Sequence, residues 1–439
     1  MYIPSMDKIE IIGNGPLKGE IIISGAKNSA LKLMAASILT DEVLHLTNMP
    51  YLKDVTSMVA LLSDMGVKVS LDGAAGPKGN TGRAMAFDAS TLSKTEASYE
   101  MVKTMRASAI VLGPLLAKYG HARVSLPGGC AIDERPLNIH LSELEKIGVH
   151  IEIEEGYITA TAPNGLKGTE VDMIVPRLNV SSVGATETLL MAATLAEGTT
   201  TLINAAIEPE IVDLCECLTK MGADIKGIGT RTIEVTGVDK LNGCSHNIIE
   251  DRIEAGTYAV APIIAGGEVE LIGASSKHLK SFLDILKQTG AEITDTDRGF
   301  IVKRDPDTEL KAIDFTTEVH PGIPTDLQAQ LMALMTISKG TAQVNETIFN
   351  NRFMHVPELN RMGANIEILD AHTVTVNGVE SLKGCPVMAT DLRASASLVL
   401  AGLVAKGHTT VNRVYHLDRG YERIEEKLSG VGAKIRRVK

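Results

Sequence analysis

Charged side chains stand where several small, apolar helices of this chain are expected to begin. The residues at these starts are Lys27 with Asn28, Arg106, Asp326 and Arg393. A cation at a helix N-terminus opposes the helix dipole at a cost of about 0.3–1 kcal/mol, and an anion bound between the cation and the backbone N–H groups removes that conflict. The alternative is a local ion pair, since Glu100 and Asp391 precede two of the cations closely. Three cations at corresponding starts favour a shared anionic ligand.

One cysteine lies in a loop that has no counterpart elsewhere in the chain, Leu126-Pro-Gly-Gly-Cys130-Ala-Ile-Asp-Glu-Arg135-Pro136. A thiol in a polar loop near a guanidinium can have a lowered pKa and act as an acid or a nucleophile. A packed or merely exposed thiol is the simpler alternative, and it is our interpretation of the other four cysteines. Cys130 is therefore a candidate for chemistry that needs further support.

Two other polar stretches have structural explanations. Residues 415–423 crowd acidic and basic side chains together, which is typical of a solvated helix start, and residues 351–357 can simply open a helix. The histidines have no metal-site spacing, and no phosphate-loop motif is present. We therefore expect no metal site.

Composition excludes several classes of protein. The net charge is -11, aromatic residues make up 3% and tryptophan is absent, which argues against a nucleic-acid surface. Neither a signal peptide nor an apolar run long enough for a membrane span is visible. Five cysteines without a CxxC pair do not suggest a disulfide framework. These features predict a reduced, cytoplasmic protein.

A short phrase recurs six times and organises the whole chain: leucine, three residues, glycine, a small residue, one more, then Ile or Val. Its glycines are Gly66, Gly148, Gly222, Gly290, Gly363 and Gly432, roughly 70 to 80 residues apart. Such a period indicates one supersecondary unit used six times. We expect each glycine to cap a helix that leads into a strand.

A small-residue apolar run precedes each phrase. In residues 184–197 the apolar residues face all directions, which predicts a buried helix. A glycine such as Gly198, Gly340 or Gly407 is expected to cap it, and a strand follows. The second helix, for example residues 209–220, carries Glu210 and Asp213 on a polar face and is expected to lie outside. Each unit therefore consists of a buried helix, a strand, an outer helix and further strands.

Six units make two domains of three. The predicted fold class is α/β, with two inside-out α/β domains, each of three repeated helix–strand units around buried helices. The first strands, near residues 8–12 and 19–24, are expected to pair with the last unit. We expect one domain to contain residues 1–26 and 250–439, the other residues 27–249, and the active site to lie in the cleft between them.

Ten motifs follow one another along the chain: Ser-Gly-Ala-Lys27-Asn28, Met-Arg106-Ala-Ser, Pro-Gly-Gly-Cys130, Ser-Val-Gly-Ala-Thr186, Ala-Ala-Ile-Glu208-Pro-Glu-Ile, Asp251-Arg-Ile-Glu254, Pro-Thr-Asp326-Leu-Gln-Ala-Gln, Asn-Arg352-Phe-Met-His-Val-Pro-Glu, Asp391-Leu-Arg393-Ala-Ser and Asp418-Arg419-Gly-Tyr-Glu-Arg. In this order they resemble the motifs of the UDP-N-acetylglucosamine 1-carboxyvinyltransferases, a family of enolpyruvyl transferases. The resemblance covers essentially the full length. The family's fold is two inside-out α/β domains of three repeats each.

The resemblance implies that the enolpyruvyl group of phosphoenolpyruvate is transferred to the 3-hydroxyl of UDP-N-acetylglucosamine by addition and elimination, the first committed step of peptidoglycan synthesis. Lys27, Arg135, Arg393 and Arg419 would surround phosphoenolpyruvate, with Asn28 beside them. Asp326 would act on the sugar hydroxyl as base or orienting group, and Cys130 would protonate the methylene carbon. Cys130 would also be the point of attack for the inhibitor fosfomycin. No metal or organic cofactor is needed.

The nucleotide contacts implied by the resemblance are Arg106, Arg135, Pro136, Leu137, Asn138, Ile139, Val180, Ser181, Ser182, Val183, Asp326 and Ile348. The chain departs from the family at Asn138, where Asp is usual, and at Val180, where some members carry Lys. Asp133 and Glu134 replace a glycine and a small residue after the cysteine. These departures put substrate affinity and loop closure in question.

Two alternatives stay open at this stage. Enolpyruvyl transfer to shikimate 3-phosphate uses the same architecture, but that sister family does not use the cysteine of the Pro-Gly-Gly-Cys130 loop. A non-catalytic paralogue that binds the sugar nucleotide would explain the departures, but not the retention of Lys27, Cys130, Asp326, Arg393 and Arg419.

Overall fold

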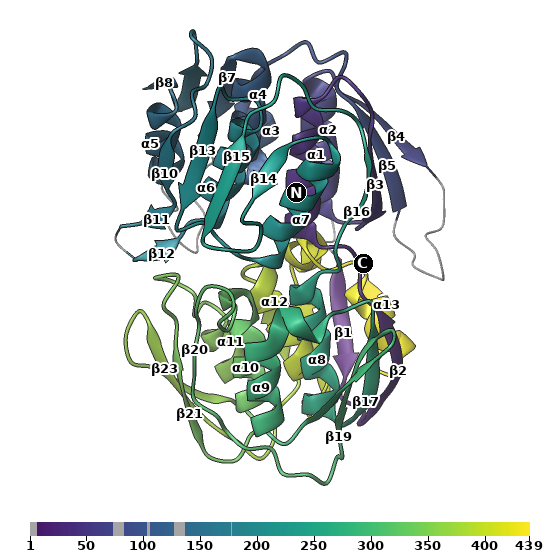
Figure 1. The fold of residues 1–439 in the computed structure, drawn as a ribbon. Coiled ribbons are helices and arrows are strands. Elements are labelled where there is room, and N and C mark those ends of the chain that lie inside the picture. The colour runs from purple at the N-terminus through teal and green to yellow at the C-terminus, as the bar shows by residue number, and fades with distance from the viewer. Residues whose placement is uncertain (1–6, 73–82, 103–105, 127–136, 177) are drawn as a thin grey trace. The chain divides into compact units, whose positions relative to one another are not determined.

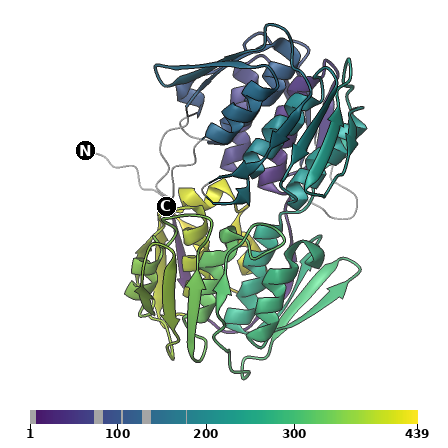
Figure 2. The same cartoon turned by 60° about the vertical axis from the view of Figure 1, so that its left-hand side comes forward.

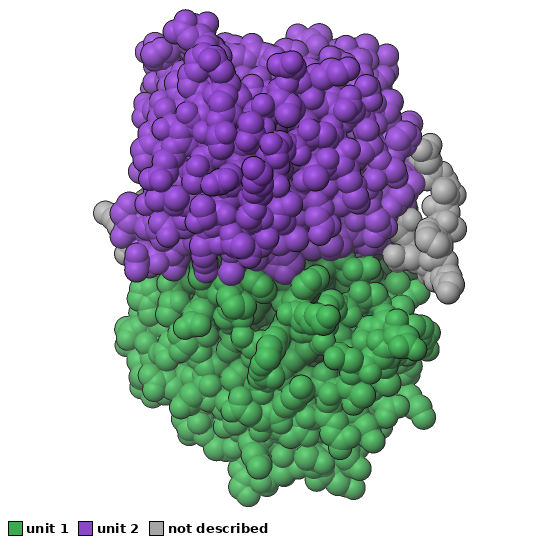
Figure 3. All heavy atoms as spheres, viewed as in Figure 1, with its two compact units in different colours: residues 1–23, 131–133, 250–439 green, residues 24–130, 134–249 purple. Residues whose placement is uncertain are grey.

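A computed structural model describes residues 7–72, 83–102, 106–126, 137–176 and 178–439, with the backbone alone for residues 72 and 106–108. The described chain separates into two compact units. Unit 1 contains residues 7–23 and 250–439, and unit 2 contains the described residues from 24 to 249 (Figure 3). The chain therefore passes from unit 1 to unit 2 near residue 24 and returns near residue 250.

Unit 2 has helices, including the 3₁₀ helices η1 and η2, and short strands. Its helices are α1 (Lys27–Ala36), η1 (Ser37–Leu39), α2 (Lys53–Asp64), α3 (Tyr99–Val102), η2 (Arg106–Val111), α4 (Leu112–Tyr119), α5 (Asn138–Lys146), α6 (Val183–Ala193) and α7 (Pro209–Lys220). Its strands are β3 (Leu44–Met49), β4 (Lys68–Asp72), β5 (Arg83–Asp88), β6 (Glu96–Ala97), β7 (His121–Ser125), β8 (His150–Glu154), β9 (Tyr157–Thr161), β10 (Glu170–Asp172), β11 (Ile174–Val175), β12 (Val180–Ser181), β13 (Thr199–Ile203), β14 (Asp224–Lys226), β15 (Thr232–Thr236) and β16 (Ser245–Asn247).

Unit 1 is built in the same way. Its helices are α8 (Arg252–Ala265), η3 (Ser276–Leu279), α9 (Lys280–Gln288), η4 (Thr325–Leu327), α10 (Gln328–Met335), α11 (Val356–Arg361), α12 (Leu392–Gly402), η5 (Val414–Arg419) and α13 (Ile424–Gly430). Its strands are β1 (Lys8–Ile12), β2 (Leu17–Ile22), β17 (Gly267–Ile272), β18 (Glu292–Thr296), β19 (Gly299–Arg304), β20 (Phe315–Thr316), β21 (Thr341–Asn345), β22 (Asn365–Ile368), β23 (Thr373–Asn377), β24 (Pro386–Met388), β25 (His408–Asn412) and β26 (Lys434–Val438).

The six-fold repeat is visible in the sheets. In the described residues each unit has three four-stranded sheets, with strand orders β16-β3-β5-β4, β6-β7-β9-β8 and β10-β13-β15-β14 in unit 2, and β2-β17-β19-β18, β20-β21-β23-β22 and β24-β25-β1-β26 in unit 1 (Figure 1). In every one, the first strand pairs parallel with the second, and the remaining neighbours are antiparallel. One sheet topology is thus used six times, as the sequence period predicted.

The chain start completes two different sheets of unit 1. Strand β1 lies between β25 and β26, with Ile9 opposite Val411 and Ile11 opposite Ile435, so its expected pairing with the last repeat is confirmed. The prediction for the second strand was wrong, because β2 pairs with β17 of the fourth repeat. Its parallel edge position is the one that β16 takes beside β3 in unit 2.

The recurring glycine phrase is a helix C-terminal turn. All six glycines have positive φ, from 92° at Gly363 to 110° at Gly290, a region that side-chain-bearing residues avoid. In α7 the N–H of Ala223 donates to the carbonyl of Leu218 at 3.0 Å and that of Gly222 to Thr219 at 2.9 Å. This is the Schellman pattern, in which the residue after the glycine bonds to the leucine that opens the phrase. The leucine and glycine are therefore parts of one hydrogen-bonded turn.

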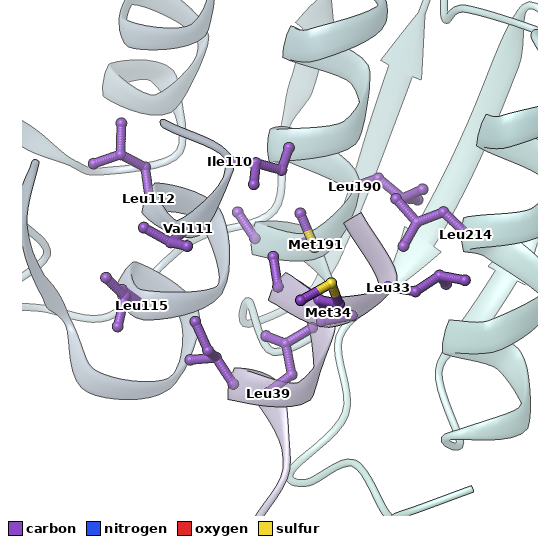
Figure 4. Packing of buried hydrophobic residues seen from close by; sticks show 14 of the residues in the cluster. Leu33, Met34, Leu39, Ile110, Val111, Leu112, Leu115, Leu190, Met191 and Leu214 are labelled. Carbon is purple, nitrogen blue, oxygen red and sulfur yellow. The ribbon is translucent and has the colours of Figure 1, made fainter. Parts of the chain in front are cut away.

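The prediction of buried helices is confirmed for α6, in which all residues from Ala185 to Ala193 are buried. Helices of each unit pack inside its sheets (Figure 2). In unit 2, Met34 of α1, Ile110 of η2 and Met191 of α6 belong to one apolar cluster (Figure 4). A second cluster fills unit 1 around α8, α10 and α12. The starts of these helices are thereby held in place by their apolar bodies.

Two details of the repeat differ from expectation. The polar face expected for α7 is solvated only in part: Glu216 and Lys220 are exposed, whereas Glu210 and Asp213 are 5% and 1% exposed and Asp213 bonds to His246. The turn glycines after the buried helices are not caps: α6 ends at Ala193, whereas Gly198 with φ of 88° lies in the following turn. A Thr-X-X-X-Gly turn separates helix from strand there. No described helix is long and apolar enough to cross a membrane.

Candidate active site

Three helices of unit 1 begin beside one another. The carboxylate of Asp251 caps α8 and that of Asp391 caps α12, each by accepting two backbone N–H groups at 2.9 and 3.0 Å. Helix α10 follows the short helix η4, which contains Asp326. An acidic cap satisfies the first-turn amides and matches the positive end of the helix dipole. These caps fix the positions from which the functional side chains extend.

Asp326 lies between two buried arginines. Its Oδ1 accepts a hydrogen bond from Nη2 of Arg352 at 2.7 Å, and its Oδ2 accepts one from Nη2 of Arg393 at 2.9 Å. The arginine side chains are 7% and 6% exposed, whereas Asp326 is 27% exposed. Two guanidinium groups favour the ionised carboxylate and fix its orientation. The exposed side of the carboxylate remains accessible to a ligand.

Arg393 has a donor that the described residues leave unused. Its Nη1 is buried and has no hydrogen-bond partner among them. Burial alone would lower the pKa of Arg393, but Asp326, Tyr421 and Asp251 together outweigh burial and raise the pKa. The guanidinium lies 5.5 Å from the ring centre of Tyr421, whose hydroxyl contacts Thr257 at 2.9 Å and Gln330 at 3.1 Å. A permanently charged, rigidly held group with an unused donor is suited to an oxyanion.

Ile348 is connected to Asp326 through a buried carboxylate. Glu346, which is 0% exposed, accepts the N–H of Ile348 at 2.9 Å through Oε1 and the hydroxyl of Thr325 at 2.8 Å through Oε2. Thr325 directly precedes Asp326. The sugar-nucleotide residue expected at Ile348 and the expected base are therefore tied to the same acidic side chain.

Arg419 is the last residue of η5, which packs against α12, and it is half-buried. Its neighbour Asp418 pairs with Arg437 at 2.5 Å, and Arg423 pairs with Glu426 at 3.1 Å. Asp418 and Arg423 therefore find these partners outside residues 415–423, in β26 and α13. Arg419 stays a candidate ligand-binding residue.

In unit 2 the first residue of α1 is Lys27, and the N-cap Ala26 provides no side-chain acceptor. The ammonium of Lys27 lies 3.3 Å from Oδ2 of Asp54 in the first turn of α2, and the two side chains are 12% and 5% exposed. Asn28 follows on the same turn and is half-buried. A cation and the first amides of α1 thus occupy one end of this helix, next to an acidic side chain.

The start of α6 holds the expected sugar-nucleotide stretch. Val180 and Ser181 form β12, and Ser182 caps α6 by accepting the N–H of Ala185 at 3.2 Å. The hydroxyl of Ser181 accepts a hydrogen bond from Nη1 of Arg231 at 2.6 Å. Arg231 therefore places a positive charge beside Ser181, the residue that follows Val180.

Helix α5 places the second part of that stretch beside α6. Leu137 is the N-cap of α5, Asn138 is exposed and Ile139 is half-buried. The imidazole of His140 approaches Gly184 so closely that a Cβ there would lie 2.7 Å from Nε2. The structure thus brings residues 137–139 and the start of α6 together within unit 2.

Several expected site residues lie outside the described residues. They are Cys130, Arg135 and Pro136, together with Asp133 and Glu134 of the same loop. For Arg106 only the backbone is described, at the start of η2, which packs against α1 and α6.

The helix-start hypothesis can now be compared with the geometry. The local partner expected for Arg393 was Asp391, but that carboxylate caps α12 and the ion pair of Arg393 is formed with Asp326. Arg352 and Tyr421 were not predicted as site residues from the sequence. Arg352 was interpreted only as part of a segment that opens a helix. Neither could be identified from local spacing, because Arg352 lies 26 residues from Asp326 within the same repeat, and Tyr421 contacts Thr257 and Gln330 of two other repeats.

Comparison with known proteins gives the family. The EPSP synthase (3-phosphoshikimate 1-carboxyvinyltransferase) family matches residues 11–428. The chain belongs to this family of carboxyvinyltransferases. It is 54% identical over 434 residues to UDP-N-acetylglucosamine 1-carboxyvinyltransferase of Paramagnetospirillum magneticum, covering 99% of each chain.

Solved structures share the fold. The enolpyruvyl transferase NikO from Streptomyces tendae is 25% identical with a TM-score of 0.85, and covers 99% of both chains. EPSP synthase from Acinetobacter baumannii is 20% identical with a TM-score of 0.74, covering 99% of this chain and all of that one. The chain is thus an enzyme with the α/β two-domain architecture of these transferases.

Proposed function

We propose that this enzyme transfers the enolpyruvyl group of phosphoenolpyruvate to the 3-hydroxyl of UDP-N-acetylglucosamine and releases phosphate, the first committed step of peptidoglycan synthesis. Full-length relatives at 54% identity that carry this activity in their name support the acceptor. Likeness to EPSP synthase at 20% identity supports only the fold, so transfer to shikimate 3-phosphate is the weaker candidate.

The unused Nη1 donor of Arg393 is the observation that carries the proposal on the side of phosphoenolpyruvate. A buried guanidinium donor without a partner is costly, and a carboxylate or phosphate oxygen would satisfy it. We assign Lys27, Arg393 and Arg419 to this oxyanion together with Arg135. Such cations stabilise negative charge in the addition step and on the departing phosphate.

Asp326 is the proposed partner of the sugar hydroxyl. Its two oxygens accept from arginines, yet each keeps a further lone pair and the side chain is partly exposed. In the addition step the hydroxyl proton passes to Asp326, the sugar oxygen bonds to carbon 2 of phosphoenolpyruvate, and Cys130 protonates carbon 3. In the elimination step the Cys130 thiolate takes a proton from carbon 3, the bond between carbon 2 and the phosphate oxygen breaks, and the departing phosphate takes the proton from Asp326. The alternative role of Asp326 is to orient the hydroxyl without accepting its proton.

The nucleotide is assigned to residues at the starts of α5 and α6 in unit 2. Asn138, Ile139 and the segment from Val180 to Val183 are the described members, and Ile348 is the member from unit 1. Arg231 offers a cation beside Val180, so we propose that it compensates for the missing lysine near the diphosphate.

One turnover experiment distinguishes the three candidates. Purified enzyme is mixed with phosphoenolpyruvate and either UDP-N-acetylglucosamine or shikimate 3-phosphate, and free phosphate and the enolpyruvyl product are measured. We expect both products only with the sugar nucleotide. Release only with shikimate 3-phosphate would reverse the assignment, and nucleotide binding without release would indicate a non-catalytic paralogue.

The role of Cys130 has its own test. Cys130→Asp should retain turnover and resist fosfomycin, because a carboxylic acid can donate a proton but is not alkylated as a thiolate is. Cys130→Ser should lose turnover. The assay is phosphate release with and without fosfomycin. Full activity of Cys130→Ser, or inactivation of Cys130→Asp by fosfomycin, would contradict the assignment.

A further inference from the structure

One arginine of strand β26 binds acidic side chains from three segments of unit 1. Nη2 and Nη1 of Arg437 donate to the two carboxylate oxygens of Asp418 in η5, at 2.5 and 3.1 Å. Its Nε donates to Glu425 of α13 at 2.8 Å, and its Nη1 lies 3.5 Å from Oδ2 of Asp7, which precedes β1. A guanidinium that binds a carboxylate through two parallel hydrogen bonds fixes orientation as well as distance. Arg437 and these three carboxylates, the Arg437 network, therefore hold η5, α13 and the start of β1 together.

The network spans the short connection between η5 and α13. Asp418 lies near the end of η5 and Glu425 near the start of α13. Both bind the same guanidinium, so the distance between the two ends of this connection is fixed. Arg419 and Tyr421 lie between them. The segment that carries Arg419, a residue assigned to the oxyanion of phosphoenolpyruvate, is therefore held at both ends by Arg437.

The backbone around this connection needs such support. Arg413 before η5 has φ of 59° and Arg423 before α13 has φ of 46°. Residues with a side chain rarely adopt positive φ, and surrounding contacts must hold them there. On the inner side, a Cβ added to Gly420 would lie 2.7 Å from a methyl carbon of Leu392 in α12, and Tyr421 is 1% exposed. Packing thus holds the inner side of the segment, and the Arg437 network holds its outer side.

We propose that Arg437 is a positioning residue for the phosphoenolpyruvate site. Its grip on Asp418 fixes the last turn of η5, and with it the direction in which the side chain of Arg419 extends toward the substrate oxyanion. The inference rests on the proposed function, because it uses the assignment of Arg419 to that oxyanion. Five hydrogen bonds to three carboxylates use the five N–H donors of the Arg437 guanidinium, so its role is to position and not to bind substrate.

The alternative is a network that only stabilises the fold. Ion pairs near a surface contribute little to stability one by one, but several charges in one network contribute more. A purely stabilising network would lower the thermal midpoint when broken and leave the substrate affinities of the folded protein unchanged. Loss of orientation at Arg419 should instead weaken the binding of phosphoenolpyruvate and spare the binding of UDP-N-acetylglucosamine.

The test measures the Kd of phosphoenolpyruvate by titration calorimetry on the full chain, which needs no acceptor. Arg437→Met should raise this Kd ~10-fold, the effect of about one charge-assisted hydrogen bond lost from the ligand. Arg437→Lys keeps the charge without the paired contact and should raise it less. The matched control is Arg436→Met, on the opposite face of the same strand, where Arg436 is 73% exposed and pairs with Glu10. The control should leave both substrate affinities unchanged.

Two further measurements ask whether the effect passes through Arg419. In an Arg419→Lys background, Arg437→Met should cause little further loss of affinity for phosphoenolpyruvate, because coupled residues are not additive. Hydrogen exchange should show lower protection of the N–H of Tyr421, which donates to the carbonyl of Leu417 at 2.9 Å. This loss is expected in Arg437→Met and not in Arg436→Met.

Equal Kd values of phosphoenolpyruvate for Arg437→Met and Arg436→Met would overturn the proposal. An equal loss of affinity for UDP-N-acetylglucosamine, or the same fold-change in the Arg419→Lys background, would also overturn it. If Arg437→Met folds poorly, Arg437→Lys is compared with the control in the same way. Failure of the proposed function has a separate sign, since the unsubstituted protein would then release no phosphate with UDP-N-acetylglucosamine, whereas the titrations alone decide the role of Arg437.

Discussion

Both oxygens of Asp326 accept a hydrogen bond from a buried arginine, which makes the position of this carboxylate depend on residues far away in sequence. Arg393 also has a buried donor, Nη1, that finds no partner among the described residues. Arg352 has a different role, since it contacts Asp326 at 2.7 Å and lies 4.9 Å from the ring centre of Phe349. We infer that Arg352 positions Asp326.

Replacing Arg352 should therefore affect catalysis more than stability. Arg352→Lys keeps the charge but loses the planar guanidinium, and a lost charge-assisted hydrogen bond costs about 1.5–3 kcal/mol. We expect kcat/KM for UDP-N-acetylglucosamine to fall ~10- to 100-fold, with the thermal midpoint lower by only a few degrees. Arg361→Lys, on the exposed side of α11, is the matched control. Equal kcat/KM values for the two variants would rule out the positioning role.

Glu187 on α6 should make stability depend on pH. Burial raises the pKa of Glu187 from 4.5 to about 7, and Lys32 at 3.2 Å opposes this only in part. The unfolded chain ionises Glu187 near 4.5 and the folded chain only near 7, so stability is lost as pH rises between these values. Below pH 4.5 and above pH 7, the contribution of Glu187 to the unfolding free energy no longer changes with pH.

Glu187→Gln removes this titration. Relative to the unsubstituted protein, the variant should gain on the order of 3 kcal/mol in unfolding free energy from pH 4.5 to pH 7. Loss of the Lys32 partner adds an offset that does not vary over that range. Denaturant unfolding at several pH values measures the difference, with Glu216→Gln on the exposed side of α7 as control. Parallel curves for Glu187→Gln and the unsubstituted protein would contradict the assignment.

At the level of elements, the repeating unit depends on the turn that ends its second helix. The leucine accepts the N–H of the residue after the glycine, and the glycine supplies a positive φ. Both requirements are local, which is why the phrase is visible in the sequence six times. The buried helices are likewise local in origin, because their small apolar residues allow close packing on all sides.

The last turn offers a matched test of this explanation. Gly432 has φ of 100° and Gly430, at the end of α13, does not have a positive φ, while neither has an atom within 4 Å of an added Cβ. Gly432→Ala should cost about 1–2 kcal/mol from backbone strain alone, whereas Gly430→Ala should be neutral or slightly stabilising. Denaturant unfolding measures both. Equal costs would show that the conformation at Gly432 does not matter.

At the level of the whole molecule, the chain start is an integral part of unit 1. Strand β1 is a central strand between β25 and β26, so the last repeat is completed by the first strand of the chain. Two segments, near residues 24 and 250, connect the units. A defect at the N-terminus should therefore damage a sheet built mainly from residues beyond 386.

Substitutions of Ile11 and Ile12, two neighbouring isoleucines of β1, test how much this strand stabilises its sheet. Ile11 is fully buried in β1 and Ile12 is 45% exposed. Ile11→Ala should destabilise the protein by about 2–5 kcal/mol, and Ile12→Ala by less than about 1 kcal/mol. Hydrogen exchange should locate the loss of protection for Ile11→Ala in β25 and β26, with β13 and β15 of unit 2 unchanged. Loss spread equally over both units would contradict this account.

The amino-acid sequence by itself determined the six-fold repeat, the fold class, the C-terminal turns and the buried helices, because hydrophobic periodicity and glycine φ act over a few residues. It did not reveal that Arg393 pairs with Asp326 rather than with Asp391, or that Arg352 binds the other oxygen of Asp326. Nor did it reveal that Asp213 of α7 is buried against His246. The contacts of Arg393 and Asp213 join elements of different repeats, and Arg352 is 26 residues from Asp326 within one repeat. Only tertiary packing decides them, since a buried charge takes whichever partner the folded chain brings within hydrogen-bond distance.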